Sequence, residues 1–217
     1  AGMVNPGYHD QPAWFKQSFL DLEEDVAEAA ADDKRVLLYF YQDGCPYCQK
    51  LLETNFAQKH LVDKTRENFD VIALNIWGDR EVTDLNGLVT TEKQFAESMR
   101  VMYTPTFVFL DEAGQAVLRL NGYYPPHKFE VALDFVAGRH EKEMSIQAFF
   151  AQNAPPAAQG KLHRDADFIQ PPYDLAARET NKPLIVLFEQ RECPACDELH
   201  LDIFQREATQ ELLQDFD

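Results

Sequence analysis

The feature that most constrains the fold is a short apolar run that leads into a pair of cysteines. Residues 36–41 read VLLYFY, a turn follows at residues 43–44, and Cys45-Pro-Tyr-Cys48 comes next. An almost wholly apolar run is typical of a central strand that is covered on both faces. A helix that begins at the cysteines places unpaired N–H groups and the positive end of its dipole there, which favours a thiolate. Thiols one helical turn apart can form and break a disulfide, so the pattern indicates redox chemistry.

The two cysteines of the first pair are expected to have different roles in a redox reaction. In such settings a cysteine pKa falls from about 8.5 to about 3.5–7.5. Cys45 is therefore the candidate nucleophile and Cys48 the candidate resolving thiol. The alternative is an inert structural disulfide.

The other two cysteines form a second pair, Cys193-Pro-Ala-Cys196, which is either a second redox centre or a passive remnant. Two such pairs together could supply four thiolates to one zinc ion. Each pair, however, is expected to open its own helix, and a whole domain separates them in the sequence. We therefore expect no metal site and no organic cofactor. His60, His127, His140 and His163 have no metal-ligand spacing, and we expect them to be solvated.

The charge balance limits the classes of partner. The chain has 37 acidic and 20 basic residues, a formal net charge of −17, which disfavours nucleic acids and anionic membranes. It has no run of about 18 apolar residues, so we expect no direct membrane insertion. The sequence begins Ala1-Gly2 without a methionine, which fits removal of a signal peptide as well as an expression scar.

The order of the expected elements indicates an α/β fold. Apolar residues at helical spacing predict a helix over residues 13–31 that packs its aromatic stripe in the core. Asn86-Gly87 is a strong hairpin signal, so we predict a β-hairpin insertion near residues 81–91. Thr91 and Gln94 form a capping box for the helix that follows. The other expected strands are residues 36–41, 69–76, 106–111 and 116–120, and the other expected helices begin near residues 45, 61, 92 and 126. This order gives a mixed central sheet flanked by helices on both faces.

An internal repeat defines the domains. Residues 182–188, the second cysteine pair and Phe204 match residues 34–40, the first pair and Phe56 at a constant spacing of 148 residues. We predict a domain over residues 1–140, a helix and linker over 141–171, and the start of a second domain over 172–217. That second copy has one expected strand and two helices, and it lacks the rest of a sheet. A fragment of this kind would leave a strand edge unpaired, so we expect the natural chain to continue.

The motifs resemble the thioredoxin superfamily. The resemblance rests on the strand before Cys45–Cys48 and on residues 103–107 (YTPTF) ahead of the terminal hairpin. It implies that Cys45 is the exposed nucleophile, that Cys48 is buried, and that Pro105, preceded by Thr104, is a cis-proline facing the dithiol. Proline is the residue before which a cis bond costs little.

A narrower likeness involves residues 44–48 (GCPYC), 77–84 (WGDREVTD) and 122–124 (GYY). These resemble the periplasmic thioredoxins associated with bacterial sulfur oxidation, the SoxW type. The likeness covers about residues 12–138 and implies export to the periplasm. One departure is notable: thioredoxin has a buried Asp six residues before the nucleophile, and here that position is Tyr39. The dithiol needs another proton acceptor, either water or a nearby carboxylate such as Asp43.

These features together predict a thiol-disulfide oxidoreductase that reduces disulfides in exported proteins. We expect the substrate to lie against Thr104 and Pro105, with Pro46 and Tyr47 beside it, and a membrane or periplasmic dithiol protein to supply electrons. Two alternatives stay open. One is a disulfide oxidase or isomerase with the same chemistry, since sequence does not give the reduction potential. The other is a non-catalytic peptide-binding or chaperone module.

Overall fold

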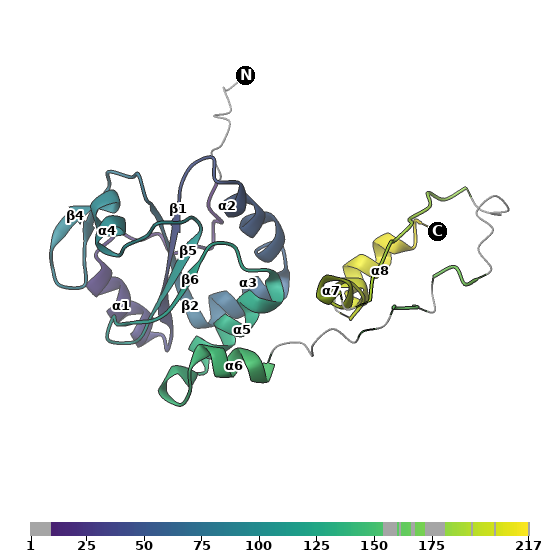
Figure 1. Cartoon of the computed structure of the whole chain (residues 1–217). Coiled ribbons are helices and arrows are strands. Elements are labelled where there is room, and N and C mark those ends of the chain that lie inside the picture. The colour runs from purple at the N-terminus through teal and green to yellow at the C-terminus, as the bar shows by residue number, and fades with distance from the viewer. Residues whose placement is uncertain are drawn as a thin grey trace, which may run out of the picture. The chain divides into compact units, whose positions relative to one another are not determined.

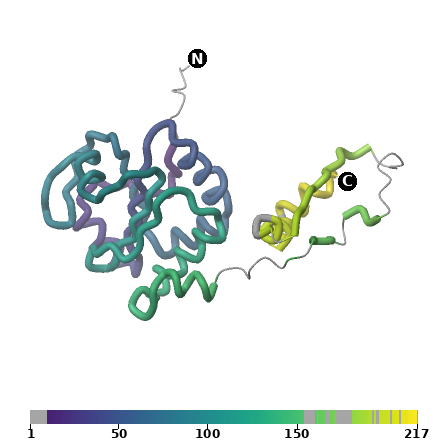
Figure 2. The backbone as a smooth tube through the Cα atoms, viewed as in Figure 1, coloured from purple at the N-terminus to yellow at the C-terminus, as the bar shows by residue number. Residues whose placement is uncertain are grey.

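The computed structural model describes residues 10–153, 160, 162–165, 168–171, 181–191, 193–201 and 203–216. The chain divides into two units, Ala1–Ala154 and Pro155–Asp217, which are treated separately below (Figures 1 and 2). Residues 1–2, whose start fits either signal-peptide removal or an expression scar, residues 154–159 of the expected linker, and the first nine residues of the predicted second domain, 172–180, lie outside the described residues. Among the helices described, none combines the length and the hydrophobicity that crossing a bilayer requires.

A mixed four-stranded sheet forms the centre of the first unit, in the order β2-β1-β5-β6 (Figure 1). β1 (Arg35–Tyr41) runs parallel to β2 (Phe69–Asn75) and antiparallel to β5 (Thr106–Leu110). β6 (Ala116–Asn121) pairs antiparallel with β5 at the edge. All of β1 except its last residue is buried, which explains its continuous apolar sequence. The predicted mixed sheet is confirmed.

Helices cover both faces of this sheet. Alternate β1 side chains face opposite sides, so Leu38 packs with α1 (Leu22–Ala31) and α4 (Glu92–Ser98), whereas Leu37 packs with α3 (Lys59–Asn68) and α5 (Pro126–Ala137) (Figure 1). α6 continues the second layer, where Phe149 packs against Phe135 of α5 at 5.3 Å between ring centroids. The helices of the unit are Leu22–Ala31 (α1), Pro46–Lys50 (α2), Lys59–Asn68 (α3), Glu92–Ser98 (α4), Pro126–Ala137 (α5) and Ile146–Asn153 (α6), and a 3₁₀ turn spans His140–Lys142 (η2).

The expected helix over residues 13–31 is wrong in its first part, because α1 begins only at Leu22. Leu20 has a φ of 65°, in the left-handed region, and its N–H donates to the hydroxyl of Ser18 at 2.6 Å. That local hydrogen bond competes with helix formation. The segment therefore enters the core irregularly: Phe15 is buried, whereas Phe19 is 99% exposed. A helical stripe would have placed both aromatic rings on one face.

The predicted hairpin and capping box are confirmed. β3 (Glu81–Thr83) and β4 (Val89–Thr91) form a small antiparallel sheet, and Gly87 has a φ of 75° in the turn between them. A positive φ suits glycine, since it has no Cβ. The capping box joins Thr91 and Gln94 at the start of α4. The hairpin is attached to the main body by the Thr83 N–H, which donates to the Leu20 carbonyl at 2.9 Å.

The helix after the first cysteine pair is interrupted. α2 passes directly into a π-helical turn, η1 (Leu51–Asn55), in which the Phe56 N–H donates to the Leu51 carbonyl at 3.1 Å. A π turn contains one more residue than an α turn. Asn55 is buried, and its Nδ2 donates to the Tyr124 carbonyl at 3.0 Å. The wider turn thus places the buried side-chain amide of Asn55 against the Tyr124 carbonyl, in the segment that precedes α5.

Arg35 fixes the start of β1. Its guanidinium is almost fully buried; it donates to the Val136 carbonyl at 2.8 Å and to both carboxylate oxygens of Glu112 at 3.1 and 3.0 Å. Glu141 lies 2.9 Å from the same group. The Arg35 hydrogen bonds lower the pKa of Glu112 to about 2, with a smaller contribution from Arg139. This network ties the sheet to the end of α5.

The second unit contains helices but no strand among its described residues. α7 (Pro194–Leu201), η3 (Ile203–Gln205) and α8 (Glu207–Leu213) follow one another along the chain. The expected strand over residues 182–188 is wrong: residues 181–190 form no regular element, and Phe188 is 90% exposed. A strand needs a neighbour to satisfy its backbone groups. The described part of this unit offers none.

Candidate functional site

The first cysteine pair forms a disulfide at the start of α2. The segment between β1 and the cysteines turns at Gly44, whose φ is 73°. Cys45 is the N-cap residue, and its sulfur accepts the Cys48 N–H at 3.1 Å. The Cα atoms of the two cysteines are 5.2 Å apart. The structure therefore places both sulfurs at a helix N-terminus, next to the positive end of the helix dipole.

The residues around position 104 lie directly against this disulfide. The Thr104–Pro105 peptide bond is cis. The Thr104 hydroxyl donates to the Cys45 sulfur at 3.3 Å, and the Thr104 carbonyl oxygen lies 3.4 Å from the same atom. In the reduced form the Cys45 thiol has an acceptor in that carbonyl. Two segments far apart in the sequence thus meet at one sulfur.

Both sulfurs belong to the buried core in this disulfide form. Cys45 is 3% exposed and Cys48 is 1% exposed. The expectation that Cys45 is exposed is therefore wrong for the oxidised protein. Thr104 lies against the Cys45 sulfur. The buried side chains on the sheet face that α3 and α5 cover surround both cysteines.

Exposed apolar and aromatic side chains lie next to the buried disulfide in the sequence. Tyr47 lies between the cysteines, while Met102 and Tyr103 immediately precede Thr104, and all three are largely exposed. Pro46 is exposed as well. Single exposed apolar residues need no explanation, but several near one reactive bond can bind a peptide.

Trp77 adds an exposed indole beyond the end of β2. Its Nε1 donates to the side chain of Gln42 at 2.8 Å, and the Lys93 ammonium lies 5.6 Å from its ring centroid. Gln42 follows β1, so this contact joins the carboxyl ends of the two parallel strands. Ligands commonly bind at such strand ends in α/β sheets.

Tyr39 occupies the core position six residues before Cys45. Its side chain is fully buried between Tyr41 and Phe107, at centroid distances of 5.7 and 5.2 Å. Its hydroxyl has no hydrogen-bond partner among the described residues. Burial, with a smaller effect of Tyr41, raises the pKa of Tyr39 well above its usual range. The phenol keeps its proton near neutrality and is not a proton acceptor there. Asp43, the carboxylate expected to serve instead, is exposed.

The second cysteine pair also forms its own disulfide. Cys193 accepts the Cys196 N–H at 3.1 Å, and the Cα atoms are 5.1 Å apart. Sequence reasoning missed its surroundings: His163, expected to be solvated, has a side chain only 7% exposed and contacts Asp197. A signal existed in the sequence, since Asp197 and a histidine at 200 both follow the cysteines within one helix.

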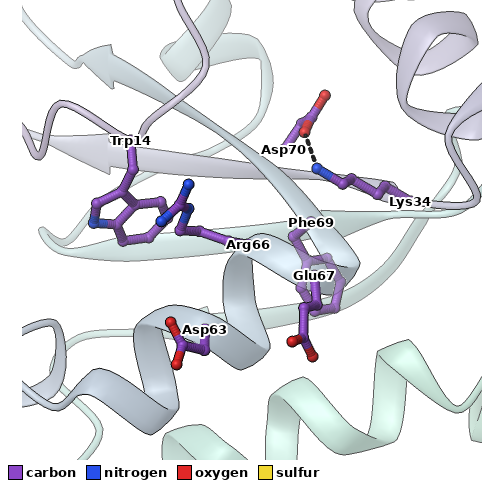
Figure 3. Close-up of a pocket in the computed structure, with 7 residues that line it drawn as sticks. All are labelled: Trp14, Lys34, Asp63, Arg66, Glu67, Phe69 and Asp70. Carbon is purple, nitrogen blue, oxygen red and sulfur yellow. Dashed lines mark hydrogen bonds and ion pairs between the residues drawn. The ribbon is translucent and has the colours of Figure 1, made fainter.

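A separate cavity of about 420 Å³ lies at the opposite end of the sheet, beside the first residues of β1 and β2 (Figure 3). Trp14 and Phe69 give it apolar walls, and Lys34 pairs with Asp70 at 3.4 Å. Arg66 lies close to the Trp14 ring in Figure 3. Acidic and basic groups are mixed in its lining, so the cavity has no clear preference for a charged ligand. It is not part of the dithiol site.

Comparisons with known proteins agree with the architecture. The family described as Thioredoxin-like domain matches residues 22–137. No curated protein matches the chain.

Several solved structures are similar to parts of the chain. A thioredoxin-fold protein from Helicobacter pylori is 25% identical, with 64% of this chain and 98% of that chain covered and a TM-score of 0.49. A thioredoxin from Thermus thermophilus is 28% identical, over 54% and 83% of the two chains, with a TM-score of 0.44. The periplasmic thioredoxin SoxS from Paracoccus pantotrophus is 23% identical, over 49% and 99%, with a TM-score of 0.35.

Proposed function

This chain belongs to the thioredoxin-like domain family, and from that premise we propose that it is a thiol-disulfide oxidoreductase that reduces disulfides in exported proteins. One observation carries the proposal. The Cys45–Cys48 disulfide opens α2 while Thr104, from a distant segment, contacts the Cys45 sulfur. A structural disulfide needs no such donor at one of its sulfurs.

The reaction starts from the reduced dithiol. The Cys45 thiolate attacks one sulfur of a substrate disulfide, whose S–S bond breaks as a mixed disulfide forms and the other substrate sulfur leaves as a thiolate. The Cys48 thiolate then attacks the Cys45 sulfur and releases the second substrate sulfur. Two electrons have passed to the substrate, which takes up two protons, and Cys45–Cys48 is again a disulfide. A dithiol donor in the periplasm or membrane must reduce it before the next cycle.

Two hydrogen-bond donors, one at the helix N-terminus and one from the distant Thr104, stabilise the thiolate of Cys45. The Cys48 N–H donates to its sulfur at 3.1 Å, and the Thr104 hydroxyl does so at 3.3 Å. Hydrogen bonds to the charged form of a group lower its pKa. Both donors are already in place in the disulfide form, so the protein is organised for this charge before it develops.

The substrate would lie as an extended strand along the backbone at Thr104. Main-chain hydrogen bonds of this kind add a strand without specifying side chains. Tyr47 and Tyr103, exposed beside the disulfide, would contact apolar side chains on either side of the substrate cystine. Pro46 is exposed beside them, whereas Pro105 is buried directly after Thr104.

The proposal includes three more specific points. The chain reduces its substrate rather than oxidising it, it is exported to the periplasm, and its role is like that of the SoxW-type thioredoxins. The narrower sequence likeness in residues 77–84 supports these points. A reduction potential near −270 mV is expected for a reductase, whereas about −120 mV belongs to a strong oxidant.

The experiment measures reduction of insulin disulfides by the full chain with dithiothreitol, together with the reduction potential of Cys45–Cys48. We expect Cys45→Ser to lower the rate by more than about 10³-fold, the scale of loss when a nucleophile is removed. Cys193→Ser is the matched control and should retain most of the activity. A potential near −120 mV would favour the oxidase or isomerase. Full biological activity of Cys45→Ser would favour a non-catalytic peptide-binding module.

A further inference from the structure

Trp77 is an exposed indole on a short segment that hydrogen bonds hold to the end of the sheet. Its ring is 65% exposed. The Trp77 backbone N–H donates to the Asn75 side chain at 3.0 Å, and the Gly78 N–H donates to the Asn75 carbonyl at 2.8 Å. The N–H of Ile76 donates to the carbonyl of Tyr41, the last residue of β1, at 2.9 Å. The backbone that carries the indole is therefore fixed.

A buried carboxylate at the start of α4 holds the same segment. Glu92 is 2% exposed, and one of its oxygens accepts the Asn75 N–H at 2.9 Å and the Arg80 guanidinium at 2.7 Å. A Cβ at Gly78 would lie 2.0 Å from the other oxygen, so a side chain there would displace the carboxylate. The Lys93 N–H donates to the Gly78 carbonyl at 3.0 Å. A ring on such a backbone loses little conformational freedom when a ligand covers it, which favours binding.

Two side chains orient the indole itself. Its Nε1 donates to Gln42 at 2.8 Å, and the Lys93 ammonium lies 5.6 Å from the ring centroid. Gln42 precedes Cys45 by three residues, a length of chain that spans at most about 11 Å. A peptide that reacts at the disulfide can therefore reach the indole with a nearby side chain.

The order of the strands indicates that Trp77 and Thr104 lie on opposite sides of the disulfide. β1 lies between β2 and β5 in the sheet. Cys45 follows β1, Trp77 follows the parallel β2, and Thr104 precedes the antiparallel β5, so all three lie at one end of the sheet. A substrate whose cystine reacts at Cys45 thus has Thr104 on one side and the indole on the other.

Lys93 indicates which kind of side chain the indole would contact. A cation is attracted to the face of an indole, and the Lys93 ammonium already lies near this ring. A lysine or arginine of the substrate would be repelled by that charge. An apolar or aromatic side chain meets no such repulsion, and covering the exposed ring removes apolar surface from water.

We propose that Trp77 is a specificity-determining residue of the Cys45–Cys48 site, which binds an apolar or aromatic side chain close to the substrate cystine. The inference rests on the proposed function and adds to it a class of substrate. Backbone pairing at Thr104 would hold many sequences alike, because main-chain hydrogen bonds do not depend on the side chains. The indole would supply the selection.

The experiment measures reduction of synthetic peptides by the full chain, with dithiothreitol as the source of electrons and its own rate subtracted. Each peptide has one intramolecular disulfide, and a single Phe replaces Ser in turn at each of the three positions before and after the first cysteine. We expect the best-placed Phe to raise kcat/KM by at least about fivefold, the scale of a side chain that contributes to binding. In Trp77→Ala the gain should fall below about twofold, through a higher KM with little change in kcat.

Leu212→Ala, at a leucine of α8 that is as exposed as Trp77, is the matched control and should keep the full preference for Phe. Equal kcat/KM for all Phe and Ser peptides in the unsubstituted chain overturns the inference, and so does a preference for Phe that Trp77→Ala retains. A preference for Lys over Phe at the same positions contradicts the assignment of an apolar side chain. Reduction of neither the peptides nor insulin contradicts the proposed function instead.

A binding measurement separates these failures, since it needs neither a change at Trp77 nor the reaction. The chain has two tryptophans, so Trp14→Phe leaves Trp77 as the reporter of indole emission. Phe peptides in which both cysteines are replaced by Ser cannot react. At least one should shift the emission to shorter wavelength as the ring leaves water, and the peptide without Phe should not. Absence of a shift overturns the inference, whereas a shift without reduction supports it and contradicts only the proposed reductase activity.

Discussion

The Cys45–Cys48 and Cys193–Cys196 disulfides have the same local geometry. In each, the sulfur of the first cysteine accepts the N–H of the second at 3.1 Å, and the Cα atoms are 5.2 and 5.1 Å apart. Each pair is followed directly by a helix. The CxxC sequence at a helix start thus has the same local arrangement beside the sheet of the first unit and in the second unit, whose described residues form no strand.

The surroundings of the two disulfides differ. The first follows a buried strand and contacts Thr104, and its neighbours are apolar. The second follows residues 181–190, which form no strand, and Asp197 of its helix contacts His163, whose ring stacks on that of His200. The comparison shows that the CxxC motif determines the local geometry of the disulfide. The side chains packed around each pair determine which groups can donate a hydrogen bond to a cysteine sulfur.

The largest expected effect tests how much the ion pair of Arg35 and Glu112 stabilises the unit that holds the first disulfide. Glu112→Gln removes the carboxylate that pairs with buried Arg35, and we expect the free energy of unfolding of the first unit to fall by about 2 kcal/mol, discounted because Glu112 is partly exposed. The second disulfide should be reduced at an unchanged rate. Urea denaturation followed by tryptophan fluorescence gives the first quantity.

The pH dependence gives a second check on Glu112. Its pKa is about 2 in the folded protein, against 4.5 as the ordinary value. A lowered carboxyl pKa stabilises the fold above the ordinary value, and that contribution is lost as pH falls through the folded value. The gap between parent and Glu112→Gln should be nearly full above about pH 5, should shrink as pH falls, and should be absent only below about pH 2. Glu97→Gln, at an exposed glutamate, is the matched control variant.

A smaller effect tests whether the core beside the first disulfide offers a hydrogen-bond partner to the Tyr39 hydroxyl. Tyr39→Phe removes a buried hydroxyl without a partner among the described residues, so we expect a gain of about 1 kcal/mol in the free energy of unfolding. Tyr103→Phe, at an exposed tyrosine, should change stability by less than about 0.5 kcal/mol. A loss of stability in Tyr39→Phe would mean that the hydroxyl has a partner, and the contrast between the two sites would weaken.

The smallest effect concerns the contact that the first sulfur has and the second lacks within the described residues. Thr104→Val removes the hydroxyl that donates to Cys45, and we expect alkylation of the reduced protein by iodoacetamide at pH 6 to slow about threefold to tenfold, the equivalent of one modest hydrogen bond. Thr104→Ser keeps the hydroxyl and should restore the rate. Equal rates for Thr104→Val and the parent would show that the contact does not stabilise the thiolate.

Much of the first unit could be predicted because its signals are local. The apolar run of β1, the Asn86-Gly87 turn and the Thr91 capping box each specify their structure within a few residues, and all three are confirmed. The fold class followed from their order. The placement of Cys45 and Cys48 at the start of a helix followed from the same short range.

The parts that could not be predicted depend on contacts between distant residues. Phe15 has helical spacing relative to Leu22, but a bond between Ser18 and Leu20 breaks the helix, and the ring reaches the core by another route. His163 and His200 are far apart in sequence, so neither predicts the other. The burial of Cys45 likewise depends on Thr104, which reaches it only in the folded sheet.

The π turn η1 has a consequence for how this protein tolerates length changes. Its extra residue sets the rotational phase between Cys48 at one end of the helical stretch and Asn55 at the other. Deleting one residue there would restore a regular helix, but it would turn Asn55 away from the Tyr124 carbonyl by about one residue's rotation, 100°. Substitutions in this stretch can be absorbed by repacking, whereas a single deletion would change the relation between the disulfide and the chain that precedes α5.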